Sequence, residues 1–108
     1  MEIAFGDNVR VIVTPETAAM GLASEAGQVL GFTTPSSTFV EVIGDLAEDY
    51  AINVSFEEIE GEFWFSKNLL EFIDHGAGTE MIIGDLKSVR RADGTWDEAR
   101  VSQKAKKK

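Results

Sequence analysis

Four glutamates in one short stretch are the residues of this chain that most directly suggest an interaction. Glu57, Glu58, Glu60 and Glu62 cluster around Gly61. A hard cation binds several oxygen ligands at once, but the spacing here is not that of an EF-hand loop. We therefore predict a solvated acidic hairpin or an acidic docking patch, with a cation site as the third alternative.

Two tryptophans are the other candidates for partner binding. Trp64 lies between Phe63 and Phe65, and neighbouring side chains on a strand point to opposite faces. We expect both phenylalanines in the core and Trp64 on the outer face, either covered by residues 80–108 or exposed to a partner. Trp96, in an otherwise polar stretch, either pins the C-terminal segment onto the rest of the protein or contacts a partner.

Residues for catalysis are missing from the sequence. The chain has no Cys, which excludes disulfides, thiolate catalysis and Cys-ligated metals. His75 is the only histidine, with Asp74 as its only neighbouring partner, in a Gly-rich stretch typical of a solvated loop. No serine elbow and no phosphate-binding glycine loop is present. We predict a protein that is not an enzyme, with no catalytic, cofactor-binding or metal-binding residues.

Charge is distributed unevenly along the 108 residues. Residues 1–80 contain 15 acidic and two basic residues, a net charge of −13, whereas residues 81–108 contain four acidic and eight basic residues, a net charge of +4. An acidic body repels phosphate, so we expect a protein partner with a basic surface rather than nucleic acid. The basic tail, residues 104–108, is either a frayed terminus or an electrostatic arm for an acidic partner or the protein's own acidic face.

Length and hydropathy indicate one small globular domain. No apolar run approaches the roughly 20 residues that span a bilayer. The N-terminus has no basic segment followed by an apolar one, as a signal peptide would. We expect a cytoplasmic protein with no membrane association.

The elements that would position the candidate residues are mostly strands. Six segments before His75 have strand composition or alternation: Asn8–Val13, Gln28–Phe32, Thr38–Ile43, Tyr50–Phe56, Glu62–Phe65 and Leu70–Ile73. Helix is scarce. Thr14–Met20 begins with an N-cap and a proline, which indicates a turn or two of helix or a mobile loop, and Ser66–Leu69 indicates a single 3₁₀ turn.

The C-terminal third is shorter and more polar. Residues 75–79 form a Gly-rich link by composition, and Met81–Ile83 is a short strand candidate. Residues 87–91 and 96–101 flank Asp93-Gly94, which predicts a hairpin whose two central residues both take positive φ. A helix over Thr95–Lys104 is the alternative.

The order of these elements over residues 4–74 resembles the SH3-like small β-barrel. The residues that carry the resemblance are Gly6–Val11, the long loop after it, Gly27–Gly31, the Tyr50–Phe56 alternation and the turn onto residues 69–73. It is most similar to small accessory barrels such as the ferredoxin–thioredoxin reductase variable chain and the photosystem I subunit that helps dock ferredoxin. KOW-type domains are similar at Gly6–Val11 and Gly27–Val29, but their RNA-contacting loops are basic.

That resemblance implies five strongly bent antiparallel strands, with Val11, Ile52, Val54 and Phe72 lining the inside. Signalling SH3 domains carry paired loop aromatics, which the segment 14–26 lacks, so proline-rich peptide binding is not expected.

The sequence therefore predicts an all-β protein with four parts. An SH3-like barrel of about five strands spans residues 1–74, a Gly-rich link spans 75–79, a C-terminal β-hairpin extension spans 80–102, and a disordered basic tail spans 103–108. We predict a non-catalytic accessory or adaptor protein that binds a protein partner through its acidic surface and exposed aromatics. The alternative is a KOW-like nucleic-acid-binding protein. Its contacts would be Lys87, Arg90, Arg91, Arg100 and the lysine tail.

Overall fold

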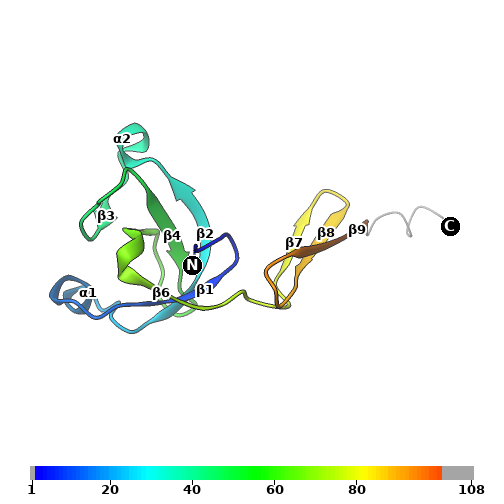
Figure 1. Cartoon of the computed structure of the whole chain (residues 1–108), viewed down its shortest axis with the longest axis horizontal. Helices are drawn as coiled ribbons and strands as arrows, with labels where there is room; N and C mark the ends of the chain where they lie inside the picture. Colours follow the sequence, from blue (N-terminus) through cyan, green and yellow to red (C-terminus); the bar gives the residue numbers. More distant parts are fainter. Residues whose placement is uncertain (1, 101–108) are drawn as a thin grey trace. The chain divides into compact units, whose positions relative to one another are not determined.

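The protein consists of two compact units, Met1–Ile73 and Asp74–Lys108, in a computed structural model that describes residues 2–100. Strands dominate both units, and only short helical turns are present in the described part of the chain (Figure 1). The prediction of an all-β protein is therefore confirmed. The predicted basic tail at 103–108 lies outside the described residues.

The first unit contains six strands, two short helices and one 3₁₀ turn. The strands are β1 (Asn8–Val11), β2 (Ala26–Thr33), β3 (Val42–Ile43), β4 (Ala51–Ser55), β5 (Phe63–Phe65) and β6 (Leu70–Asp74). The helices are α1 (Pro15–Ala19) and α2 (Pro35–Thr38), and the 3₁₀ turn is η1 (Lys67–Leu69). Five of the six predicted strands and both predicted helical turns match these elements.

These strands form one sheet in the order β3-β5-β4-β2-β1-β6. The long, curved β2 pairs antiparallel with β1 on one side and with β4 on the other (Figure 1). Its register with β4 shifts between Val29 and Gly31, which leaves Leu30 as the extra residue of a bulge and bends the strand. No ladder joins the edge strands β3 and β6 within residues 2–100, so the sheet has two edges.

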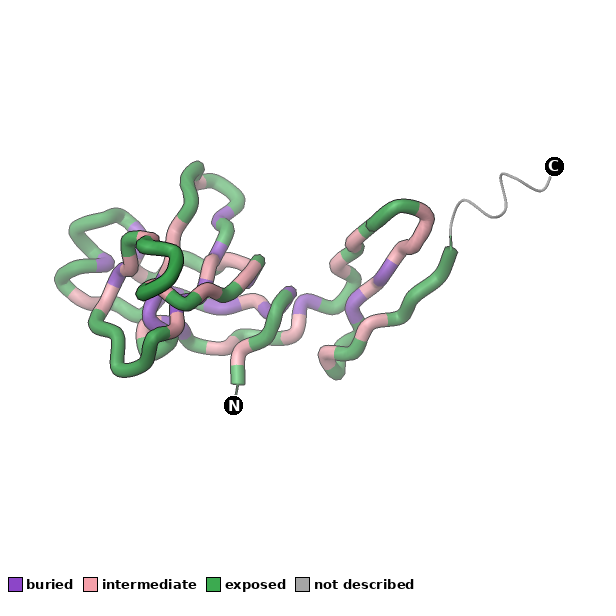
Figure 2. Tube along the Cα trace, turned by 90° about the horizontal axis from the view of Figure 1, so that it is seen from above, coloured by how far each residue is buried: buried purple, intermediate pink, exposed green. Residues whose placement is uncertain are grey.

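Every second residue along the strands faces the core of the first unit. Its buried hydrophobic residues are Val9, Val11, Leu22, Val29, Ile43, Ile52, Val54, Phe56, Phe65 and Leu70. Phe56 packs edge-to-face against Phe65, with ring centroids 6.1 Å apart. Burial of each such side chain stabilises the fold by roughly 1.5–3 kcal/mol. Figure 2 shows buried stretches on the strands and exposed loops between them.

Three expected core positions are less buried than the sequence predicts. Phe72 is half-buried and lines a surface pocket rather than the core. Phe63, expected to be buried like Phe65, is half-buried but packs against the core, edge-to-face with Phe56. Val13 is 64% exposed although it continues the alternation of Val9 and Val11, because β1 ends at Val11.

Helix α1 begins as the sequence predicts. Thr14 is the N-cap, and its side chain accepts a hydrogen bond from the backbone N–H of Thr17. The Thr17 hydroxyl in turn accepts one from the backbone N–H of Thr14, which completes a capping box. Pro15 occupies the first turn, where its missing N–H costs nothing.

The predicted strand over residues 38–43 is mostly wrong. Pro35 starts the short helix α2, and Ser36 binds the Asp49 carboxylate through both its backbone N–H and its hydroxyl. Phe39 ends this helix in the left-handed region at φ 60° and is 84% exposed. Only Val42 and Ile43 form a strand, which pairs in parallel with β5. The helix thus takes up Thr38, and residues 39–41 of the predicted strand have no regular secondary structure.

The second unit is an antiparallel sheet of three strands, β7 (Glu80–Ile83), β8 (Leu86–Arg90) and β9 (Trp96–Arg100), with β8 in the middle. The predicted strand and hairpin are confirmed, and β7 extends the hairpin into a meander. Because Trp96–Arg100 is a strand, the helical alternative is wrong over those residues.

The Asp93-Gly94 turn differs from the one predicted. Gly94 has φ 91°, whereas Asp93 has a negative φ, so only one of the two takes the left-handed conformation. The Gly94 N–H donates to the Arg91 carbonyl and the Arg91 N–H donates to the Thr95 carbonyl. This is a three-residue loop closed by a glycine bulge instead of a two-residue turn.

Residues 75–79, which the sequence predicts as a link, belong to the second unit and are hydrogen-bonded to its strand β8. Gly78 N–H donates to the Arg90 carbonyl, and Arg90 N–H donates to the Thr79 carbonyl. The Thr79 hydroxyl donates to the Gly76 carbonyl. The two bonds to Arg90 extend the pairing with β8 to the residues just before the start of β7.

Candidate partner-binding site

The four predicted glutamates occupy the loop between β4 and β5, and all four are exposed. Ile59, between them, packs against the core and anchors the loop. Gly61 takes φ 133°, and a Cβ there would lie 3.0 Å from the Phe63 ring. The loop is therefore a fixed turn that presents carboxylates to solvent.

A metal ion is the third alternative that the sequence leaves open for this loop. Among residues 2–100 no group of three or more acidic or histidine side chains is arranged to hold one. The structure thus gives no support to a cation site, and the loop is an acidic surface.

Trp64 lies on the outer face of the sheet and is half-buried. It pairs with Asn53 on β4 and Val42 on β3, which share its face. Its indole N–H donates to the carboxylate of Glu62 over 3.2 Å. The structure thus joins Trp64 to the acidic loop as one surface, as a partner site requires.

Trp96 belongs to the second unit, where it contacts Arg90. The Arg90 guanidinium carbon lies 5.1 Å from the centroid of the indole ring, and the Arg90 residue is only 3% exposed. Arg90 also approaches His75, with 3.5 Å between Nη2 and Nδ1. The contact that the structure gives for Trp96 is thus with a buried arginine of its own unit.

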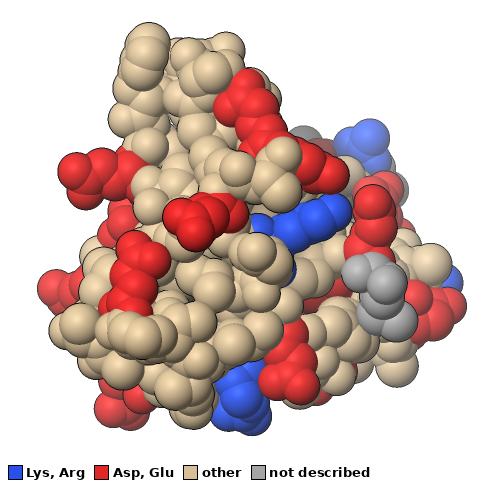
Figure 3. Space-filling model, turned by 60° about the vertical axis from the view of Figure 1, so that its left-hand side comes forward, with Lys and Arg blue, Asp and Glu red and all other residues tan. Residues whose placement is uncertain are grey.

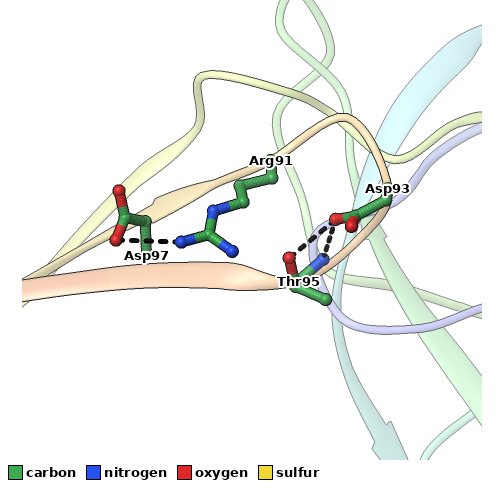
Figure 4. A network of polar contacts seen from close by, with 4 residues as sticks. All are labelled: Arg91, Asp93, Thr95 and Asp97. Atoms are coloured by element: carbon green, nitrogen blue, oxygen red, sulfur yellow. Dashed lines mark hydrogen bonds and ion pairs between the residues drawn. The ribbon is translucent and has the colours of Figure 1, made fainter.

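The loop that carries Asp93 is held by its own polar side chains (Figure 4). The Asp93 carboxylate accepts hydrogen bonds from the Thr95 hydroxyl (2.6 Å) and the Thr95 backbone N–H (3.0 Å). These bonds stabilise the charged form and hold the pKa of Asp93 below its ordinary value. Arg91 forms an ion pair with Asp97 across the hairpin at 3.2 Å.

Sequence reasoning missed a surface pocket of the first unit with a volume of about 600 Å³. Its lining includes the buried Ile52 of β4 and Leu70 of β6. Half-buried Ile3, Tyr50 and Phe72 form its walls. Pockets of roughly 300–1,000 Å³ with mainly apolar walls are the usual size for organic ligands.

Charged side chains surround the mouth of this pocket. Glu2, Glu48 and Asp49 supply three carboxylates, and Lys67 supplies one ammonium group. Lys67 is 3.7 Å from Glu48, and both side chains are more than half exposed. The pocket therefore combines a set of apolar side chains with charged ones whose net sign is negative.

Tyr50 links the walls to the rim. Phe32 stacks on its ring, with centroids 5.6 Å apart and planes 13° apart. Burial raises the pKa of Tyr50, and the negative charges of Glu2 and Glu48 raise it further. The charges of both carboxylates thus act on the ionisation of the Tyr50 phenol.

Three segments far apart in the sequence meet at this pocket: the N-terminus, residues 48–52 at the end of the β3–β4 connection and the start of β4, and residues 67–72 of η1 and β6. Nothing in their spacing predicts that they meet. The only sequence signal is the group of acidic residues Asp45, Glu48 and Asp49 just before Tyr50, which is also typical of an ordinary solvated loop.

The comparisons with known proteins give no counterpart. No protein-family model, curated protein or solved structure matches this chain. None of the described helices is long and apolar enough to cross a membrane.

Proposed function

We propose that this chain is a non-catalytic adaptor or accessory protein whose first unit is an SH3-like small barrel that binds a protein partner with a basic surface. The strand order supports the barrel: β1, β2, β4, β5 and β6 lie in one bent sheet, with a long connection after β1 and a 3₁₀ turn before the last strand. That is the layout on which the resemblance to SH3-like domains rests.

The observation that carries the partner class is the charge of the first unit. Residues 1–73 contain 13 acidic residues and two basic ones, a net charge of −11. Figure 3 shows one face of the molecule, on which acidic side chains are widely spread and basic ones are few. A surface of one sign steers a partner of opposite charge and discriminates against others.

Within this surface, the β4–β5 loop and Trp64 form the best-defined patch, which we call the acidic loop patch (Glu57, Glu58, Glu60, Glu62 and Trp64). Protein interfaces commonly have a polar rim, and tryptophan is enriched among the residues that carry their binding energy. The charges would set the association rate, and Trp64 would supply apolar contact area.

The alternative of nucleic-acid binding has less support in the described residues. Residues 74–100 contain six acidic and four basic residues. Lys87 pairs with Glu80, Arg91 with Asp97 and Arg100 with Asp85. Arg90 is buried against Trp96. A gel-shift titration of the full chain with RNA and with DNA at low salt is expected to show no retardation, and retardation with a steep salt slope would favour this alternative.

The test of the adaptor function is capture of a partner from the source cell at low and at high salt, followed by measurement of its affinity. We expect a protein with a basic surface whose affinity falls as salt rises. Replacing all four loop glutamates with glutamine should weaken binding at least tenfold.

The matched control removes four exposed carboxylates elsewhere on the same unit: Glu16→Gln, Glu25→Gln, Glu41→Gln and Glu71→Gln. It should retain most of the affinity. Equal losses in the two variants would refute the acidic loop patch, and the absence of any partner at low salt would refute the adaptor function.

A further inference from the structure

The pocket between β4, β6 and η1 fits a chemically defined group of the partner. We propose that it binds a basic side chain, a cationic group on an apolar stem, presented by an extended segment of a protein. The inference deepens the proposed function and rests on it for the kind of partner, but it concerns a site separate from the acidic loop patch.

The shape of the pocket argues for an amphipathic occupant. Ile52 and Leu70 are buried at its base, and Ile3 and Phe72 stand beside them. An aliphatic stem laid on these side chains would leave water, at a gain roughly proportional to the apolar area covered. A fully polar cation, such as a hydrated metal ion, would gain nothing from such walls.

The rim argues for a positive charge at the end of that stem. Asp49 already accepts hydrogen bonds from the backbone N–H and hydroxyl of Ser36, so its carboxylate is fixed in place. Glu2 and Glu48 lie close enough to the Tyr50 hydroxyl to hinder its ionisation. Glu48 and Asp49 directly precede Tyr50 in the chain and line the pocket with it, so a cation bound there would meet negative charge and an aromatic ring.

Lys67 shows that this rim attracts an ammonium group. It is one of only two basic residues in the first 80, and its Nζ lies 3.7 Å from a Glu48 carboxylate oxygen. The pair is more than half exposed, so it contributes little to stability and can open at low cost. An incoming cation would compete with Lys67 for Glu48.

The size of the pocket favours a peptide segment over a lone amine. A volume of about 600 Å³ exceeds what one side chain fills. The mouth is bordered by exposed side chains from separate segments, which leaves room for the backbone on either side of the inserted residue.

The experiment is an amide NMR titration of the full chain with three compounds at physiological salt. The first is acetylated and amidated Gly-Lys-Gly, the second is the same peptide with norleucine in place of lysine, and the third is pentylammonium. We expect the lysine peptide to shift the amides of Tyr50, Asn68 and Phe72 and to bind at least tenfold more tightly than the norleucine peptide.

Three variants locate the site. Glu2→Gln with Glu48→Gln should weaken binding of the lysine peptide about tenfold, whereas Glu57→Gln with Glu58→Gln, the same charge change on the acidic loop patch, should change it less than twofold. Lys67→Met should strengthen binding about threefold, because it removes the competing cation. A merely structural role of Lys67 would not produce that gain.

The results of these experiments distinguish failure of the pocket proposal from failure of the proposed function. Equal binding of the lysine and norleucine peptides, or equal losses in the two glutamine pairs, would overturn the pocket while leaving binding at the acidic loop patch untouched. Pentylammonium bound as tightly as the lysine peptide would overturn the protein segment as the source. Absence of any captured partner, with the pocket still binding the lysine peptide, would instead refute the adaptor function.

Discussion

The guanidinium of Arg90 lies over the indole ring of Trp96, with its central carbon 5.1 Å from the ring centroid. Arg90 is on the middle strand β8 and Trp96 opens β9, directly opposite in the register. No hydrophobic side chain is buried in the described part of the second unit, whereas Arg90 and Ser88 are buried, at 3% and 5% exposure. The stacked arginine therefore fills the centre of this small sheet, where a larger domain would bury an aliphatic side chain.

Replacing Arg90 with methionine should loosen the second unit, because the cation–π contact is worth roughly 0.5–2 kcal/mol when desolvated. Hydrogen exchange should show faster exchange of the β8 and β9 amides. Arg91→Met makes the same chemical change one residue further on, at an exposed ion pair with Asp97, and should alter exchange little. Equal acceleration in both variants would contradict a special role for the stacked arginine.

Gly27 is required by close packing in the first unit. A Cβ on it would lie 2.6 Å from Cγ1 of Val54 and 2.7 Å from the backbone oxygen of Ser55. We expect Gly27→Ala to lower the free energy of unfolding by about 1–3 kcal/mol, the usual cost of overpacking. Thermal or denaturant unfolding of the full chain, followed at first-unit amides, measures this cost.

Gly31 on the same strand is the matched control, since a Cβ there would meet nothing within 4 Å. Gly31→Ala should be neutral or should stabilise by a few tenths of a kcal/mol to about 1 kcal/mol, because alanine restricts the unfolded chain. A loss of stability as large as that of Gly27→Ala would show that β2 tolerates no side chain at either position.

Tyr50 is the only tyrosine, so the ultraviolet absorbance of the phenolate reports on this residue alone. Its pKa should exceed the ordinary value of 10.0, because burial and then the charges of Glu2 and Glu48 disfavour ionisation. Glu2→Gln with Glu48→Gln should move the pKa back toward 10.0, and Glu57→Gln should leave it in place.

The same shift makes stability depend on pH at the alkaline end. The pKa of the Tyr50 phenol is higher in the folded state than in the unfolded state. Its contribution to stability is therefore complete below the unfolded pKa and is lost as the pH rises through the folded pKa. The wild-type chain should therefore lose stability above about pH 10 more steeply than Tyr50→Phe. Parallel pH profiles of the two proteins would contradict this.

The sequence predicts the alternating strands because burial acts on every second residue, as in Ile52 and Val54. It predicts the start of α1 because a threonine N-cap followed by proline is a local signal. It misplaces the segment around Phe39, since the contact that decides its conformation joins Ser36 to Asp49, 13 residues away. No local pattern contains that information.

The sequence likewise predicts one part of the candidate site and not the other. The acidic loop patch is visible in the sequence because its four glutamates are neighbours in one turn and Trp64 follows directly. The pocket is not visible, because Glu2, Glu48 and Lys67 come from three separate segments that meet only in the folded unit. Phe72 illustrates the difference: its apolar character predicts the core, but its place on the edge strand β6 leaves it lining the pocket.

The Asp93 turn offers a final prediction, at acid pH. Hydrogen bonds from the Thr95 hydroxyl and then its backbone N–H hold the pKa of Asp93 below 3.8. A lowered carboxylate pKa stabilises the folded hairpin above the unfolded value, and that contribution disappears as the pH falls through the folded one. Carboxyl-carbon NMR should show the Asp93 pKa rising toward 3.8 in Thr95→Val, whereas Thr95→Ser, which keeps the hydroxyl, should leave it low. If serine and valine gave the same pKa, the hydroxyl of Thr95 would not be the main cause.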